Sequence, residues 1–239
     1  MRKRLYFPTE SVKNLLLLSV LALGGTALAQ SDNRYCGSGD VPDFGGTNDG
    51  PAALPTRCIN TALMSTPSPG KEIKVSEQKG LEAALQSVSC GDTIVLQASQ
   101  TFAPFILPPK KCDAAHWITI RSSGSAELPS EGSRLTPCYA GQTSLPDRPT
   151  YSCPTAKDVL ARVELKAGAG AITVSAGANR YRIIGLEVTR TAETGTVYAL
   201  IRFGDGADHI IIDRCWIHGT PLDETVRGIN LGGSSYVGV

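Results

Sequence analysis

The residues of this chain that could carry out acid–base chemistry gather in its last forty positions. Three of them could bind a carboxylate or take the proton beside one: Arg202, His218 and Arg227. Asp223 and Glu224 follow His218 closely enough to complete an acid–base pair. Because most exposed charges have no specific role, a solvated surface position is the alternative for each of these residues.

Candidate binding residues lie in the same part of the sequence. Trp216 offers an apolar ring on which a sugar could stack, and Asn230 offers an amide for its hydroxyls. Asp205 and Asp208 carry the oxygen ligands that calcium prefers, and calcium is the one cofactor these residues suggest. Two alternatives stand beside these roles, because Trp216 could pack beneath a loop and aspartate also favours turns.

Composition and motifs exclude several classes of function. The chain has 23 Lys and Arg against 22 Asp and Glu, and no basic stripe, so we expect no nucleic-acid partner. It contains no phosphate-binding loop, dinucleotide fingerprint, zinc-protease motif or nucleophile elbow. Hydride transfer, nucleotide hydrolysis and serine-esterase chemistry therefore have no support.

The first 29 residues have the three parts of a secretory signal. Basic residues precede an apolar run over 15–23, and Ala27-Leu28-Ala29 supplies the small residues that a signal peptidase reads. A bilayer-spanning helix needs about 20 apolar residues, and this run is much shorter. We therefore expect cleavage after Ala29, export from a bacterium to the periplasm or exterior, and no membrane attachment of the mature chain.

Cysteine usage agrees with export. Seven cysteines follow the signal: Cys36, Cys58, Cys90, Cys112, Cys138, Cys153 and Cys215. In an exported chain they indicate a disulfide framework, and neighbours in sequence are the pairs that we expect to bond. These are Cys90 with Cys112 and Cys138 with Cys153, while Cys36 or Cys58 would pin the N-terminal segment.

A repeat sets the expected fold. The stretches 171–188 and 200–217 superpose with an offset of 29 residues, and a third copy begins at Gly228. Each copy holds short strands with alternating apolar residues, separated by Gly, Asn or Asp corners. A period between 20 and 50 residues is typical of a solenoid, in which strands of successive coils stack as parallel sheets. Cys215 matches Leu186 in this repeat, which predicts a free thiol that points inward.

The same offset assigns the outward side chains. Thr173, Arg202 and Asn230 should stack in one column, and Glu187 and Trp216 in another. Charged and polar side chains from neighbouring coils would then share one outer face.

Other elements follow from local patterns. Apolar residues at Leu81, Ala84, Leu85 and Val88 predict an amphipathic helix over 81–89, placed to cap the open end of the solenoid. Three strands are expected after it: Thr93–Gln97, Phe102–Leu107 and Trp117–Arg121. The expected domain limits are an irregular extension over 30–78 and a solenoid over 79–239, with a proline-rich loop over 122–158.

The opening Leu81-Glu-Ala-Ala-Leu with Cys90-Gly-Asp-Thr-Ile-Val-Leu96, and the coil over 208–217, resemble the pectate-lyase-like right-handed β-helix superfamily. More closely, residues 75–239 resemble uncharacterised exported β-helix proteins of soil bacteria. The resemblance implies an all-β, right-handed parallel β-helix with a short N-terminal cap helix. We expect it to be incomplete at the C-terminus, because Val239 falls within the third copy.

The superfamily contains polysaccharide lyases and hydrolases, but also adhesins, so the fold does not name a reaction. In its lyases an Arg or Lys takes the proton next to a uronate carboxylate, whose charge calcium or another cation offsets. That chemistry implies a polysaccharide partner, and Arg202 as the matching cation. Three hypotheses stay open: an enzyme acting on polysaccharide, a non-catalytic binding protein, and a truncated product without independent activity. We expect a monomer.

Overall fold

The computed structural model describes residues 60–143, 152–153, 155–166, 168–191, 195–221 and 223–239, all within one compact unit. The expected signal over 1–29, and Cys36 and Cys58, lie outside the described residues. The described part consists mostly of strands, with a single α-helix. None of its helices is long and apolar enough to cross a membrane.

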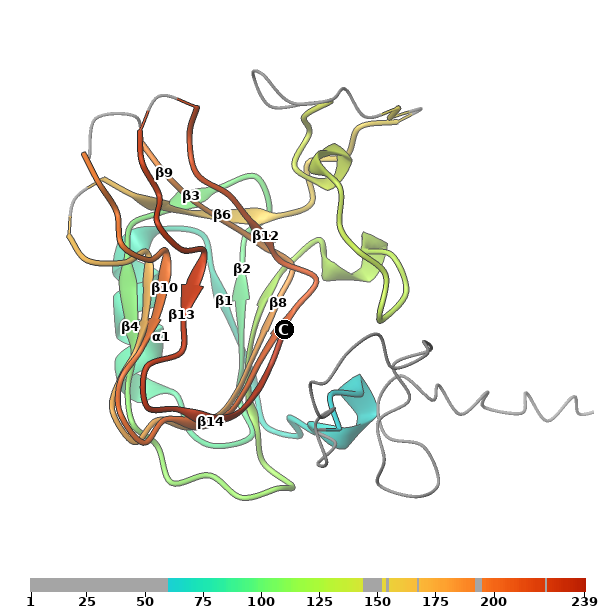
Figure 1. The fold of residues 1–239 in the computed structure, drawn as a ribbon. Helices are drawn as coiled ribbons and strands as arrows, with labels where there is room; N and C mark the ends of the chain where they lie inside the picture. The colour runs from blue at the N-terminus through green and yellow to red at the C-terminus, as the bar shows by residue number, and fades with distance from the viewer. Residues whose placement is uncertain (1–59, 144–151, 154, 167, 192–194, 222) are drawn as a thin grey trace, which may run out of the picture. The chain divides into compact units, whose positions relative to one another are not determined.

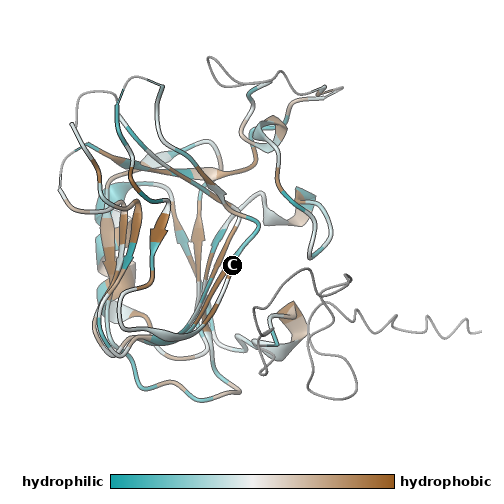
Figure 2. Cartoon of the chain, viewed as in Figure 1, coloured by the Kyte–Doolittle hydropathy of each residue, from teal (hydrophilic) through white to brown (hydrophobic). Residues whose placement is uncertain are grey.

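The strands form three parallel sheets around a shared apolar interior (Figures 1 and 2). Sheet A has the order β1 (Glu72–Val75), β2 (Thr93–Leu96), β5 (Ile118–Ser122), β8 (Asn179–Ile184), β11 (Asp208–Asp213), β14 (Ser235–Gly238). Sheet B has the order β12 (Trp216–Ile217), β9 (Leu186–Arg190), β6 (Ala161–Leu165), β3 (Thr101–Phe102). Sheet C has the order β13 (Ile229–Asn230), β10 (Ile201–Phe203), β7 (Ile172–Val174), β4 (Phe105–Leu107). From β7 onward the chain passes through sheets C, A and B in turn and then returns to sheet C.

The pairing register confirms the predicted 29-residue offset. Ile172 lies opposite Ile201 in sheet C, and Ile183 lies opposite Ile212 in sheet A. All four side chains are buried in the core. Each buried aliphatic side chain contributes about 1.5–3 kcal/mol, so the stacked interior is the main source of stability.

The third copy follows the repeat less closely than expected. Ile229 pairs with Ile201, but Ser235 lies opposite Asp208, so the offset has shortened to 27. Leu231 follows the end of β13 and is exposed. The paired part of β13 is only two residues long, which leaves Leu231 outside the ladder.

The N-terminal elements are more regular than the sequence indicated. The helix α1 (Gln78–Ser87) begins three residues before the expected start and buries Leu81, Ala84 and Leu85. A strand, β1, lies inside the range that was expected to be irregular. Pairing of Glu72 with Thr93 and of Val75 with Leu96 satisfies its backbone, which the short alternating segment could not do alone.

The expected strand over 102–107 is divided into β3 and β4 at Pro104, which cannot donate to a strand ladder. Both predicted disulfides form: Cys90 bonds to Cys112, and Cys138 bonds to Cys153.

The predicted loop between β5 and β6 has a small apolar cluster of its own, separate from the main core. The described part of this loop contains two 3-10 helices, η2 (Ser125–Glu127) and η3 (Pro137–Tyr139). The cluster members are Leu135, Ala140, Val159 and Leu160. A third 3-10 helix, η1 (Leu63–Ser65), precedes β1.

Candidate functional site

The outer face of sheet C carries an exposed arginine, Arg202. Arg202 lies opposite Thr173 on β7 and Asn230 on β13, and Ile106 on β4 continues the row. Arg202, Asn230 and Ile106 are exposed. Among the described residues the Arg202 guanidinium has no hydrogen-bond or ion-pair partner. We call these four residues the open arginine column.

A glycine shapes the floor of this column. A Cβ on Gly170 would lie 3.2 Å from both Cγ and Cδ of Arg202, so the glycine leaves room for the arginine stem. Arg227 is exposed on the segment that leads into β13, and its carbonyl accepts a hydrogen bond from the Leu200 N–H at 3.3 Å. Its backbone is therefore held beside the start of β10, although the structure records no contact between the two arginine side chains.

The outer face of sheet B holds its charges in a tight cluster. Arg162 Nε donates to Glu187 Oε2 at 2.9 Å, and His218 Nε2 lies 3.0 Å from Glu187 Oε1. The Glu187 side chain is only 4% exposed, against 13% for His218 and 35% for Arg162. We call these three residues the Glu187 cluster.

The strand register explains why His218 meets Glu187 and not Asp223 or Glu224. Ile217 pairs with Val188, which places His218 one step further along, diagonal to Glu187. Glu224 Oε2 instead accepts from Thr196 Oγ1 at 3.2 Å. The carboxylate expected beside His218 is thus supplied by the preceding coil.

Both nitrogens of the His218 ring lie against acceptors. Nδ1 is 3.0 Å from the Gly219 carbonyl and 3.4 Å from Thr189 Oγ1, and Nε2 faces Glu187. A ring with protons on both nitrogens would satisfy the carbonyl and the carboxylate together. The buried carboxylate of Glu187 therefore lies between Arg162 and the ring of His218.

Trp216 packs against other parts of the protein, and its role in stacking on a sugar stays a prediction. Its ring stacks on His218 with centroids 3.9 Å apart. It also packs against the small apolar cluster of the loop between β5 and β6. The indole is therefore held between His218 and this loop.

The two aspartates proposed for calcium lie near the corner between sheets C and A. Asp205 is exposed, while Asp208 is half-buried and its Oδ2 lies 3.4 Å from His209 Nδ1. Asp208 Oδ1 is buried without a hydrogen-bond partner. No group of three or more His, Cys, Asp or Glu side chains that could hold a metal ion occurs among the described residues. Calcium binding by this pair stays a prediction that these side chains alone do not support.

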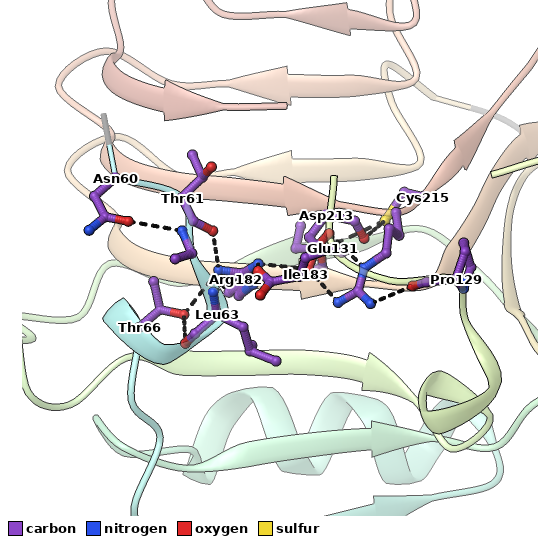
Figure 3. A network of polar contacts seen from close by, with 12 residues as sticks. Asn60, Thr61, Leu63, Thr66, Pro129, Glu131, Arg182, Ile183, Asp213 and Cys215 are labelled. Carbon is purple, nitrogen blue, oxygen red and sulfur yellow. Dashed lines mark hydrogen bonds and ion pairs between the residues drawn. The ribbon is translucent and has the colours of Figure 1, made fainter. Parts of the chain in front are cut away.

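The outer face of sheet A carries a buried ionic network that the sequence did not indicate (Figure 3). Arg182 is 1% exposed, and its Nη2 lies 2.7 Å from Asp213 Oδ2 and 3.1 Å from Glu131 Oε1. Its Nη1 donates to the Thr61 carbonyl at 2.8 Å and to Thr66 Oγ1 at 3.1 Å. Arg182 therefore fastens two segments, around 61–66 and 131, onto sheet A.

Asp213 is the shared anion of this network. Burial alone would raise the pKa of Asp213, but hydrogen bonds from Arg214 and Arg182 outweigh burial and hold that pKa below its usual value. Arg214 donates to both carboxylate oxygens, at 2.9 and 2.8 Å, and to the Pro129 carbonyl at 2.9 Å. The charges here therefore pair with one another and serve the architecture, although Arg182 Nε is buried without a hydrogen-bond partner among the described residues.

A cavity of about 390 Å³ adjoins this network, and Arg134, Arg182, Asp213 and Cys215 are among its lining residues. Cys215 is a free thiol and packs against the main core, as predicted. Burial raises the pKa of Cys215 to about 12, so the thiolate is scarce at neutral pH. This cysteine has the properties of a structural residue.

The structure brings some predicted site residues together and leaves others apart. Arg202 meets Asn230, and His218 meets Trp216. Asp205, Asp208 and Arg227 join neither pair by any recorded side-chain contact. Arg162 and Glu187 complete the cluster, and sequence reasoning had given them no functional role.

Comparisons with known proteins identify no family for this chain. No family model matches it, and no curated protein matches it. Among solved structures, an alginate lyase from Paenibacillus sp. str. FPU-7 is similar at 22% identity and a TM-score of 0.40, over 61% of this chain. The match spans only 36% of that lyase. A likeness this low carries no argument about function.

Proposed function

We propose that this chain forms part of a secreted, right-handed parallel β-helix protein that binds an acidic polysaccharide along the outer face of sheet C. Support for the β-helix comes from the order in which the chain visits the three sheets and from the parallel register of successive coils. Single residues with positive φ, Gly185 at 64° and Arg214 at 45°, turn the chain from sheet A into sheet B in consecutive coils. The signal pattern and two disulfides support export.

The binding proposal rests on the guanidinium of Arg202, which has no hydrogen-bond or ion-pair partner among the described residues. A planar guanidinium matches a carboxylate with two parallel hydrogen bonds, and uronate sugars present one carboxylate per residue. Thr173 and Asn230 add hydroxyl and amide groups in the same column, which suit sugar hydroxyls. An anionic polymer bound along this column would thus contact the cation of Arg202 between the neutral polar side chains of Thr173 and Asn230.

The test is an affinity measurement on the purified chain with polygalacturonate, alginate and neutral dextran. We expect a uronate polymer to bind, dextran not to bind, and added salt to weaken the complex. Arg202→Ala should weaken binding about tenfold, which corresponds to about 1.4 kcal/mol. Lys74→Ala is the matched control, because Lys74 is an exposed cation on β1 of sheet A. Equal losses in the two variants, or no binding to either uronate polymer, would overturn the proposal.

A second candidate is a lyase in which His218 acts with Glu187, whose Oε1 lies 3.0 Å from His218 Nε2. Proton transfer at Nδ1 would require the ring to leave the Gly219 carbonyl, which lies 3.0 Å away. In such an elimination the base takes the proton beside the uronate carboxylate. The glycosidic C–O bond breaks, and the leaving oxygen takes up a proton as a double bond forms in the sugar. Ultraviolet absorbance of that unsaturated product measures it directly. Activity lost in His218→Ala would establish this candidate, and its absence on every uronate polymer would remove it.

A further inference from the structure

The Glu187 cluster contains a second arginine that is held in place but only partly used. Arg162 projects outward from β6, between Thr101 on β3 and Glu187 on β9. Of its guanidinium nitrogens only Nε has a recorded partner, at 2.9 Å from Glu187 Oε2. A guanidinium has five N–H donors, so the four on its two terminal nitrogens remain without a partner among the described residues.

From this geometry we infer that Arg162 is a preorganised oxyanion-binding site on the outer face of sheet B. The side chain is 35% exposed, which leaves its terminal fork open to solvent, while the anchoring carboxylate is 4% exposed. The open fork presents two parallel donors, the geometry that a carboxylate accepts. The inference does not depend on polymer binding at Arg202, which lies on another sheet.

The rigidity of the anchor distinguishes Arg162 from an ordinary surface arginine. The other carboxylate oxygen of Glu187 contacts His218, whose ring is stacked on Trp216. Ordering a free arginine on binding has an entropic cost, and Glu187 has already imposed much of that order on Arg162. Glu187 is therefore a positioning residue for the fork of Arg162.

The charges around Arg162 limit what it can bind. The carboxylate of Glu187 offsets the charge of Arg162 and also contacts His218. Glu164, on the same face of β6 and opposite Thr189, is a nearby acid that disfavours highly charged ligands. The site therefore suits a singly charged oxyanion, for which the carboxylate of a hexuronate and a sulfate group share the required chemistry.

Arginine side-chain NMR tests the site without any polymer. In protein labelled with ¹⁵N-arginine, the Nε–H signal of Arg162 is identified by its loss in Arg162→Lys. Sodium glucuronate should shift this signal saturably at constant ionic strength, whereas glucose should not. Sodium methyl sulfate, a singly charged sulfate ester, is the second arm, and the oxyanion that binds more tightly identifies the source of the ligand chemistry.

Variants separate this site from the proposed polymer site. Arg162→Lys should abolish the saturable shifts of the backbone amides next to position 162, since an ammonium lacks the fork, and Arg202→Ala should leave the shift of the Arg162 signal unchanged. Glu187→Gln should weaken binding about tenfold, which corresponds to about 1.4 kcal/mol, with backbone spectra confirming the fold. No saturable shift with either oxyanion, or equal affinity in Glu187→Gln, would overturn the inference.

Discussion

Arg182 and Arg202 both project outward from strands in consecutive coils, yet their surroundings are opposite. Arg182 on β8 is 1% exposed and donates to two carboxylates, a hydroxyl and a carbonyl. Arg202 on β10 is exposed and has no recorded partner in the described residues. One coil pattern thus produces both a structural arginine and an available one.

The difference comes from segments outside the coils. Within sheet A, Arg182 lies between Thr119 and Ile211, and neither can neutralise a cation. Glu131 and the Thr61 carbonyl, from the loop after β5 and the segment before β1, supply part of the missing contacts. No segment with such groups contacts Arg202 in the part of the chain that the structure describes. Together with Asp213 on β11, segments outside the strands therefore bury Arg182 and make it structural.

Removing Arg182 should produce the largest loss of stability among these substitutions. A small loss would contradict the contrast drawn between Arg182 and Arg202. Arg182→Met leaves Asp213 and Glu131 without this cation and releases Thr61 and Thr66. Removing one partner of a buried ion pair costs about 3–5 kcal/mol. Urea unfolding followed by circular dichroism measures the loss. A loss below about 1 kcal/mol would mean that Arg182 is no more structural than an ordinary surface residue.

The contribution of the Glu187 cluster to the free energy of unfolding should lie between those of Arg182 and Arg202. Glu187→Gln keeps the shape but removes the charge that Arg162 and His218 share. Hydrogen bonds to charged groups contribute about 1.5–3 kcal/mol, so we expect a loss in that range by the same urea measurement. Glu164→Gln is the matched control on the neighbouring strand, because the Glu164 carboxylate has no recorded partner. Equal effects of the two substitutions would show that the contacts of Glu187 add no stability.

The sequence predicted the repeating parts of this fold well. Stacking at an offset of 29, both described disulfides and the free Cys215 followed from periodicity and spacing. The same offset places His218 beside Thr189, two residues from Glu187, so a diagonal search of the repeat could have found that contact.

The contacts that were missed break the period. Arg162 pairs with Glu187 at an offset of 25, because that coil is shorter, and a fixed offset of 29 passes over it. Arg182 meets Thr61 across 121 positions, through segments that lie outside the repeat. Only the packing of the folded chain brings such residues together, so no local sequence pattern predicts these contacts.

Acid should remove part of the Arg182 network reversibly. Burial alone would raise the pKa of Asp213 in the folded protein, but hydrogen bonds from Arg214 and Arg182 outweigh it and keep this pKa below the ordinary value of 3.8. The resulting stability is present above pH 3.8 and is lost as the pH falls through the folded-state pKa. Urea unfolding along a pH series, compared with Asp213→Asn, isolates this contribution. The variant should be less stable near neutral pH and show a shallower acid loss, so identical pH profiles would contradict the assignment.

Arg202 should give the smallest change in stability, and this separates the two arginines most sharply. Substitution of an exposed side chain without partners usually changes the free energy of unfolding by less than about 0.5 kcal/mol. Arg202→Met, the same chemical change as Arg182→Met, should therefore unfold at the wild-type urea midpoint. The same preparation should bind uronate polymer more weakly than wild type. A stability loss as large as that of Arg182→Met would mean that Arg202 has structural partners, and the open arginine column would no longer be available to a ligand.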